Sequence, residues 1–132
     1  MTEPRSIAIV LDTTAVTAWA RGSVAVGELL AELDDEHAAA VLPLSCLVEA
    51  AHKTGMLEQA RLDLLVTHPA VFLLEDAADD WKALAATRLL VDRLDLASAA
   101  WFGLKCEVDV MTSDPRWYSS VNGGRDVLEF EP

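Results

Sequence analysis

Ile7-Ala8-Ile9-Val10-Leu11-Asp12 is a run of apolar, largely β-branched residues that ends in a carboxylate. Polar residues bound the apolar run on both sides, which predicts a strand covered on both faces of a parallel sheet. An isolated carboxylate beside so much apolar surface is costly to desolvate. Asp12 is therefore a candidate functional residue at the end of a buried strand.

Similar apolar segments alternate with helical patterns along the rest of the chain, which favours an α/β fold. We expect a three-layer sandwich with a mostly parallel central sheet of four or five strands, helices on both faces and right-handed crossovers. Strands are expected at 7–11, 39–42, 71–74, 108–111 and 127–130, and helices at about 23–36, 43–55, 56–66, 79–90 and 95–103. Asp95 is expected to cap the last of these helices.

The length of 132 residues fits a single domain, 1–132, and the 52% of hydrophobic residues provides a sizeable core. No apolar stretch approaches the roughly 20 residues that span a membrane. Met1 to Ser6 lead into an apolar run that is too short for a secretion signal. Cys46 and Cys106 lack metal-ligand spacing and are expected to be reduced thiols. These features favour a soluble, cytoplasmic protein without membrane partners.

The formal net charge of -12 gives the protein a long-range field that repels nucleic acid and anionic membranes. This charge argues against a simple nucleic-acid-binding module. It argues less against an enzyme whose divalent ions bridge the protein to phosphate, because a bound cation reverses the local charge.

Four acidic residues lie inside or at the edge of apolar segments: Asp12, Glu49, Asp95 and Asp114. Two of them close predicted strands and two belong to predicted helices. Ligands of parallel sheets bind beyond the carboxyl ends of the strands, so we expect these side chains to converge there. Clustered carboxylates repel one another unless a cation neutralises them, and Mg²⁺ and Mn²⁺ prefer oxygen ligands. The pattern predicts a metal site.

Each carboxylate also has a structural explanation when it is taken alone. Asp12, Asp95 and Asp114 could each cap a helix, since Asp is a favoured cap residue. Glu49 shares a helical face with Ser45 and His52 and could belong to a solvated polar stripe. The joint pattern favours a site, because one shared site explains four placements at once.

The chain resembles the PIN domain family, and in particular the single-domain VapC-type toxins, over nearly its whole length. The matching pieces are Val10 to Ala15, Pro43 to Glu49, Leu94 to Ala100, and Met111 to Asp114 followed by Trp117. Their order and spacing carry the resemblance rather than any single motif. A receiver domain fits less well, because it needs adjacent acidic residues after its first strand and a Lys near Asp114. A haloacid dehalogenase fits less well, because Thr14 stands where that family needs a second Asp.

The resemblance implies a metal-dependent ribonuclease in which Asp12, Glu49, Asp95 and Asp114 bind Mg²⁺ or Mn²⁺ and act in catalysis. Such enzymes are expected to leave a 5′-phosphate and a 3′-hydroxyl. Thr13 and Thr112 would orient the carboxylates or contact substrate, although both could be ordinary turn residues, and Asp92 could replace or supplement Asp95.

The resemblance also implies partners. These are an RNA substrate, an antitoxin protein and a second copy in a homodimer, with the apolar helix Met56 to Val66 as a possible interface. Arg21, Arg116 and Arg125 are the candidates for RNA contacts. The alternative function is a PIN-like protein-binding module with weak or lost catalysis, whose acidic pocket accepts an Arg or Lys from its partner.

Overall fold

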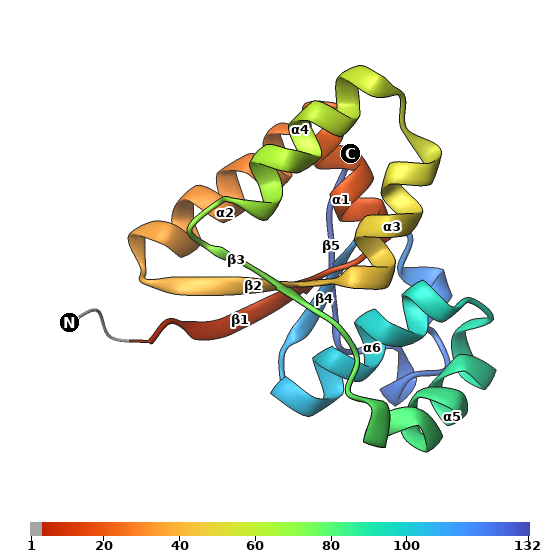
Figure 1. Ribbon diagram of the computed structural model, residues 1–132. Coiled ribbons are helices and arrows are strands. Elements are labelled where there is room, and N and C mark those ends of the chain that lie inside the picture. Colours follow the sequence, from red (N-terminus) through yellow and green to blue (C-terminus); the bar gives the residue numbers. More distant parts are fainter. Residues whose placement is uncertain (1–3) are drawn as a thin grey trace.

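The computed structural model describes residues 4–132 and has an α/β architecture (Figure 1). Residues 1–3 lie outside the described residues. They belong to the segment from Met1 to Ser6, for which the sequence predicts no secretion signal. The strands are β1 (Ser6–Leu11), β2 (Ala38–Pro43), β3 (Val71–Leu74), β4 (Asp109–Thr112) and β5 (Val127–Glu129). The α-helices are α1 (Thr13–Ala20), α2 (Val24–Asp35), α3 (Leu44–Lys53), α4 (Met56–Val66), α5 (Trp81–Val91) and α6 (Leu94–Cys106).

The five strands form one sheet in the order β3-β2-β1-β4-β5, and every neighbouring pair is parallel. The central strands are the most apolar, because both of their faces are covered: the last three residues of β1 and all of β2 are buried. The predicted fold class is therefore confirmed, with the sheet fully rather than mostly parallel.

Helices cover both faces of the sheet, which makes three layers (Figure 1). Helices α1, α2 and α4 pack on one face, and α6, with α5 outside it, packs on the other. Helix α3 begins directly after β2 and contacts both α1 and α6. The carboxyl ends of the strands are therefore enclosed by helix starts from both layers.

Residues 4–132 also contain three short 3₁₀ segments: Ala78–Asp80, Pro115–Tyr118 and Asn122–Gly124. The prediction that Asp95 caps α6 is wrong. Arg93 has the extended backbone of a cap residue, and its carbonyl accepts the first helical hydrogen bond, from Ala97. Helix α6 thus starts at Leu94 and places Asp95 in its first turn, where a carboxylate is favoured by the helix dipole.

Both cysteines are free thiols, with Cys46 buried and Cys106 partly buried. Between residues 4 and 132, no helix is both long and apolar enough to cross a bilayer.

Candidate functional site

The sheet has a topological switch point between β1 and β4, because the chain continues from β1 toward β2 while β4 pairs on the other side of β1. Ligands of open α/β sheets bind at such a point, beyond the carboxyl ends of the strands. Asp12 directly follows β1, and Thr112 is the last residue of β4. The Asp12 amide donates to the Met111 carbonyl at 3.3 Å. Two of the predicted residues therefore lie together at this edge.

Asp12 is fully buried and caps α1. Its Oδ1 accepts hydrogen bonds from the Thr14 amide (2.9 Å), the Thr14 hydroxyl (2.6 Å) and the Ala15 amide (3.1 Å). Its Oδ2 accepts one from the Tyr118 hydroxyl at 2.6 Å. Burial raises the pKa of Asp12 above its ordinary value, and these hydrogen bonds oppose the rise. The capping role considered for Asp12 is confirmed, and it fixes the carboxylate at the switch point.

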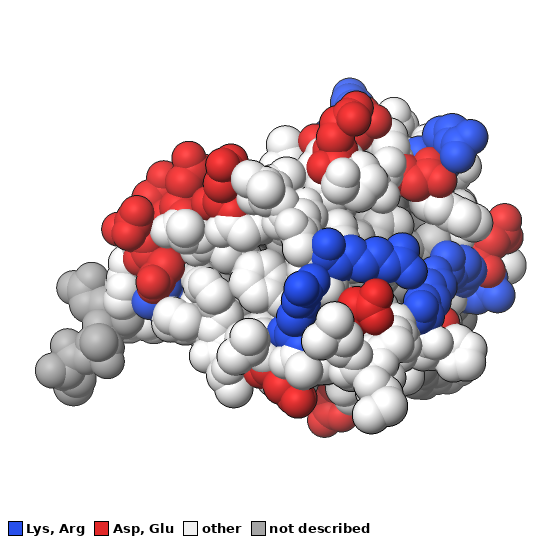
Figure 2. Space-filling view, turned by 90° about the horizontal axis from the view of Figure 1, so that it is seen from above, with Lys and Arg blue, Asp and Glu red and all other residues white. Residues whose placement is uncertain are grey.

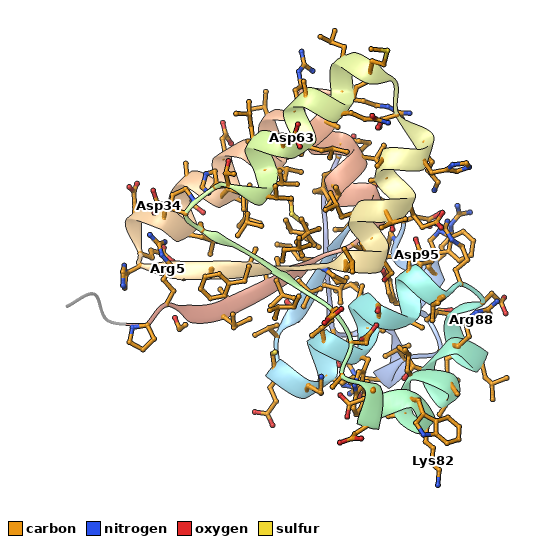
Figure 3. All side chains as sticks on the ribbon, in the orientation of Figure 1. Arg5, Asp34, Asp63, Lys82, Arg88 and Asp95 are labelled. Atoms are coloured by element: carbon orange, nitrogen blue, oxygen red, sulfur yellow. The ribbon has the colours of Figure 1, made fainter. Side chains whose placement is uncertain are left out.

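Asp95, in the first turn of α6, is only 4% exposed and lies beside α3 (Figure 3). The Thr13 hydroxyl donates to Asp95 Oδ2, so the residue after Asp12 reaches directly to the second carboxylate. Arg93 donates two hydrogen bonds to the same carboxylate, from Nε to Oδ1 at 3.1 Å and from Nη2 to Oδ2 at 2.6 Å. The Arg93 guanidinium also lies over the Trp117 ring, 5.6 Å from its centroid.

Asp114 follows β4 by two residues and joins the site through hydroxyl groups. Its amide donates to Thr112 Oγ1 at 3.1 Å, and Thr112 Oγ1 is 3.3 Å from Thr14 Oγ1, which itself donates to Asp12. The Asp114 carboxylate is held by Arg116, with Nε and Nη2 at 2.9 and 3.1 Å from its two oxygens. The Arg116 guanidinium lowers the pKa of Asp114.

Glu49 lies midway along α3 and is partly buried. It lines a groove of about 370 Å³ that also contains Asp95 and the pair Glu75 and Asp76, which follows β3. Ser98 donates to Asp76 Oδ2, whereas Asp76 Oδ1 is buried without a hydrogen-bond partner. This groove adds two carboxylates that were not predicted, although both follow a strand in the same way that Asp12 follows β1.

Asp92 lies at the end of α5 and not on α6 with Asp95. It ends α5 in a left-handed conformation with φ of 62° and is exposed, so it does not share a helix with Asp95. The helical-turn spacing expected from its position three residues before Asp95 does not arise, because the backbone leaves the helical conformation at Asp92 and Arg93.

Besides Thr14 and Ala15, which donate to the Asp12 carboxylate, three further residues that were not predicted site residues bond to Asp12 or Asp95, two at the carboxylate and one at the backbone carbonyl. Tyr118 and Arg93 are described above, and Cys46 on α3 donates from Sγ to the Asp95 carbonyl at 3.2 Å. Burial raises the pKa of the Cys46 thiol well above its usual value, so it stays protonated as a donor. Arg93 lies two residues before Asp95 and could have been proposed; Tyr118 is 106 residues from Asp12 and gave no signal.

The donor set fits a hard divalent cation in its chemistry, since it consists of carboxylate and hydroxyl oxygens. The unpartnered Asp76 Oδ1, in the groove with Glu49 and Asp95, is an acceptor that a cation would satisfy. Within residues 4–132, however, no three His, Cys, Asp or Glu side chains are grouped closely enough to hold one ion together. Arg93 occupies the Asp95 carboxylate instead, and Arg116 occupies Asp114.

Comparison with known proteins adds no identification: the sequence matches no family model and no curated protein.

Proposed function

We propose that this protein is a PIN-type ribonuclease that depends on Mg²⁺ or Mn²⁺. The observation that carries the proposal is the Thr13 hydroxyl, which links the Asp12 cap at the switch point to the buried Asp95 carboxylate. Asp12 is 0% exposed and no Lys or Arg side chain is paired with it among the described residues, so its carboxylate is costly to keep ionised, whereas Asp95, 4% exposed, is paired with Arg93. Their placement beyond strand ends supports a functional rather than a purely structural role.

Asp12 and Asp95 would hold the ion, and Glu49 and Asp114 would join them after a side-chain rearrangement, because no three of these acidic side chains are grouped closely enough in the described residues. A bound divalent cation lowers the pKa of its water and offsets charge on a phosphodiester during in-line displacement. The chain's own residues orient the ligands: Thr14, Ala15 and Tyr118 fix the Asp12 carboxylate, and Thr13 fixes Asp95. Arg93 must release Asp95 for that carboxylate to bind a cation, and its guanidinium is then free to contact substrate phosphate.

Toxin activity, an antitoxin partner and a cytoplasmic location belong to the same proposal. A homodimer is part of it too, and α4 supports this part because it exposes Met56 (90%), Leu57 (74%) and Leu64 (65%). Large apolar side chains at such exposure are typical of a surface that another chain covers.

A second candidate function, a protein-binding module, is favoured by the groove that contains Glu49 and Asp95. Leu44, Val48 and Leu94 line this groove beside the acids and are 38%, 56% and 56% exposed. A partner segment with apolar residues around one Arg or Lys would match this surface, since Arg93 already shows that Asp95 accepts a guanidinium.

RNA cleavage by the purified protein separates the two functions. The nuclease reading predicts that single-stranded RNA is cut in the presence of Mn²⁺ or Mg²⁺ and leaves 5′-phosphate ends. Asp12→Asn should abolish cutting while leaving the circular dichroism spectrum unchanged, because Asn can still cap α1. Equal cutting by both proteins would indicate a contaminating nuclease, and no cutting by a folded, Mn²⁺-bound protein would favour the binding module.

A further inference from the structure

A second groove, of about 930 Å³, borders the Asp12 site on the side of α1 and α2. Thr13, Thr14 and Ser113 line it at the switch point, while Arg21, Ser23 and Val24 line it where α1 turns into α2. A chain lying along this groove would therefore run from the start of α2 to the residues beside Asp12.

Two hydroxyl groups in this groove have no hydrogen-bond partner in the described part of the chain. Thr17 is only 9% exposed, and its Oγ1 is buried without a partner. Ser23 precedes α2 but makes no capping hydrogen bond, and its Oγ is also buried and unpartnered. Buried hydroxyls are normally hydrogen-bonded, so two orphans in one groove point to a ligand with acceptor atoms.

The start of α2 favours a negatively charged acceptor. The first amides of a helix lack intrahelical acceptors, and the helix dipole places partial positive charge there, which together suit a phosphate. Val24 and Ala25, the first two residues of α2, line the groove, and Arg21 and Lys53 add two cationic side chains to it.

Glu28 and Glu131 also line this groove, so its two cationic side chains are matched by two carboxylates. That balance suits a ligand with one negative charge per phosphorus, a phosphodiester, better than a multiply charged phosphate. Charge is distributed unevenly over the rest of the surface. Figure 2 shows acidic side chains gathered where α2 leads into β2, and Lys and Arg side chains lying together across the middle of the face. The net charge of -12 therefore does not exclude a local site for an anion.

We propose that the groove binds a backbone phosphodiester of single-stranded RNA at the start of α2, through the Thr17 and Ser23 hydroxyls and the first amides of the helix. The identity of the ligand rests on the proposed ribonuclease function, because that function makes RNA the substrate. The phosphodiester site itself rests on the groove, the unpartnered hydroxyls and the helix start.

Binding measured without divalent ions tests this site separately from catalysis. In EDTA and low salt, dimethyl phosphate should shift the NMR signals of the Thr17, Val24 and Ala25 amides, and a short single-stranded RNA should shift the same signals and displace it. No shift with either probe would overturn the proposal. A shift with dimethyl phosphate that RNA cannot reproduce would overturn the RNA assignment. Absent cleavage with intact binding would count against the proposed function only.

Charge variants at Val24 provide the sharper test, because its side chain is 70% exposed at the first position of α2. Val24→Glu should weaken RNA binding by about threefold or more relative to Val24→Gln, while favouring the helix through its dipole. Leu89→Glu, at an 83% exposed position on α5 outside the groove, makes the same change in net charge. Equal losses in Val24→Glu and Leu89→Glu would show that only the overall charge matters and would overturn the site.

Thr17→Val tests the hydroxyl itself. It removes a group that has no partner in the protein, so the melting temperature should not fall. Affinity for dimethyl phosphate should fall, whereas Thr17→Ser should retain it. Unchanged affinity in a folded Thr17→Val protein would remove Thr17 from the site.

Discussion

The Tyr118 hydroxyl donates a 2.6 Å hydrogen bond to Asp12 Oδ2, which joins the 3₁₀ segment after β4 to the carboxyl end of β1. Both residues are buried, at 2% and 0% exposure. Burial, followed by the nearby Asp12 charge, raises the pKa of Tyr118 well above its usual value, so the phenol remains a donor. The carboxylate at the switch point is therefore positioned by the far end of the chain.

Replacing Tyr118 by Phe should reveal this hydrogen bond. The change leaves Asp12 Oδ2 buried without its donor, and the free energy of unfolding should fall by about 1–3 kcal/mol near neutral pH. The loss should shrink in acid, where Asp12 becomes protonated and needs the donor less. Urea denaturation at several pH values measures both effects; a loss that is the same at every pH would show that Tyr118 acts through packing alone.

The raised pKa of Asp12 predicts the direction of a pH effect on stability. The folded protein binds the Asp12 proton more tightly than the unfolded chain, so this group's contribution is fully present below its ordinary pKa of 3.8 and is lost as the pH rises through the folded pKa. In EDTA at neutral pH, Asp12→Asn should therefore melt higher than wild type. Asp12→Ala should be less stable than Asp12→Asn by about 1 kcal/mol, because it also loses the cap of α1. A lower melting temperature for Asp12→Asn would contradict the pKa shift.

Arg93 is paired with Asp95 and would compete with the proposed cation for that carboxylate, which predicts opposite effects of removing Arg93 with and without metal. In EDTA, Arg93→Gln should destabilise the protein by about 1–3 kcal/mol, a value below that of a fully buried pair because the Arg93 side chain is 32% exposed. With Mn²⁺, the stabilisation of Arg93→Gln should exceed that of wild type, since the carboxylate no longer has an internal partner. Calorimetry of both proteins measures this difference, and an equal gain in the two would show that Arg93 does not compete.

Thr13 is predicted to orient Asp95 rather than to act in the reaction directly. Thr13→Val removes the donated hydrogen bond while nearly preserving shape, and should lower Mn²⁺ affinity by about tenfold. Thr13→Ser restores the hydroxyl and serves as the matched control. Titration calorimetry distinguishes the two; equal affinity in the valine and serine variants would leave Thr13 a packing residue.

The fold could be predicted because its signals are local. The apolar runs at 7–11 and 71–74 mark strands regardless of their surroundings, and Pro43 and Gly55 mark the limits of one helical stretch; both strands and the helix lie where expected. The start of α6 was misplaced because Asp is a common cap, whereas here the extended backbone at Arg93 starts the helix one residue before Asp95.

The candidate site could be predicted only in part, because side-chain partners depend on contacts between distant segments. The carboxyl ends of β1 and β4 place Asp12, Thr112 and Asp114 by topology alone. No sequence pattern indicates that the Arg93 guanidinium lies over the Trp117 ring, or that β3 brings Asp76 beside Glu49 and Asp95. These contacts follow from how helices pack at one end of the sheet.

The melting temperature as a function of Mn²⁺ concentration tests most directly whether these carboxylates bind a divalent cation. An ion that binds only the folded state raises the melting temperature by mass action. We predict a rise for wild type that grows with Mn²⁺ concentration and disappears in Asp95→Asn, while Asp63→Asn, a change at an exposed position on α4, keeps it. No rise in wild type, or the same rise in Asp95→Asn, would contradict the metal site.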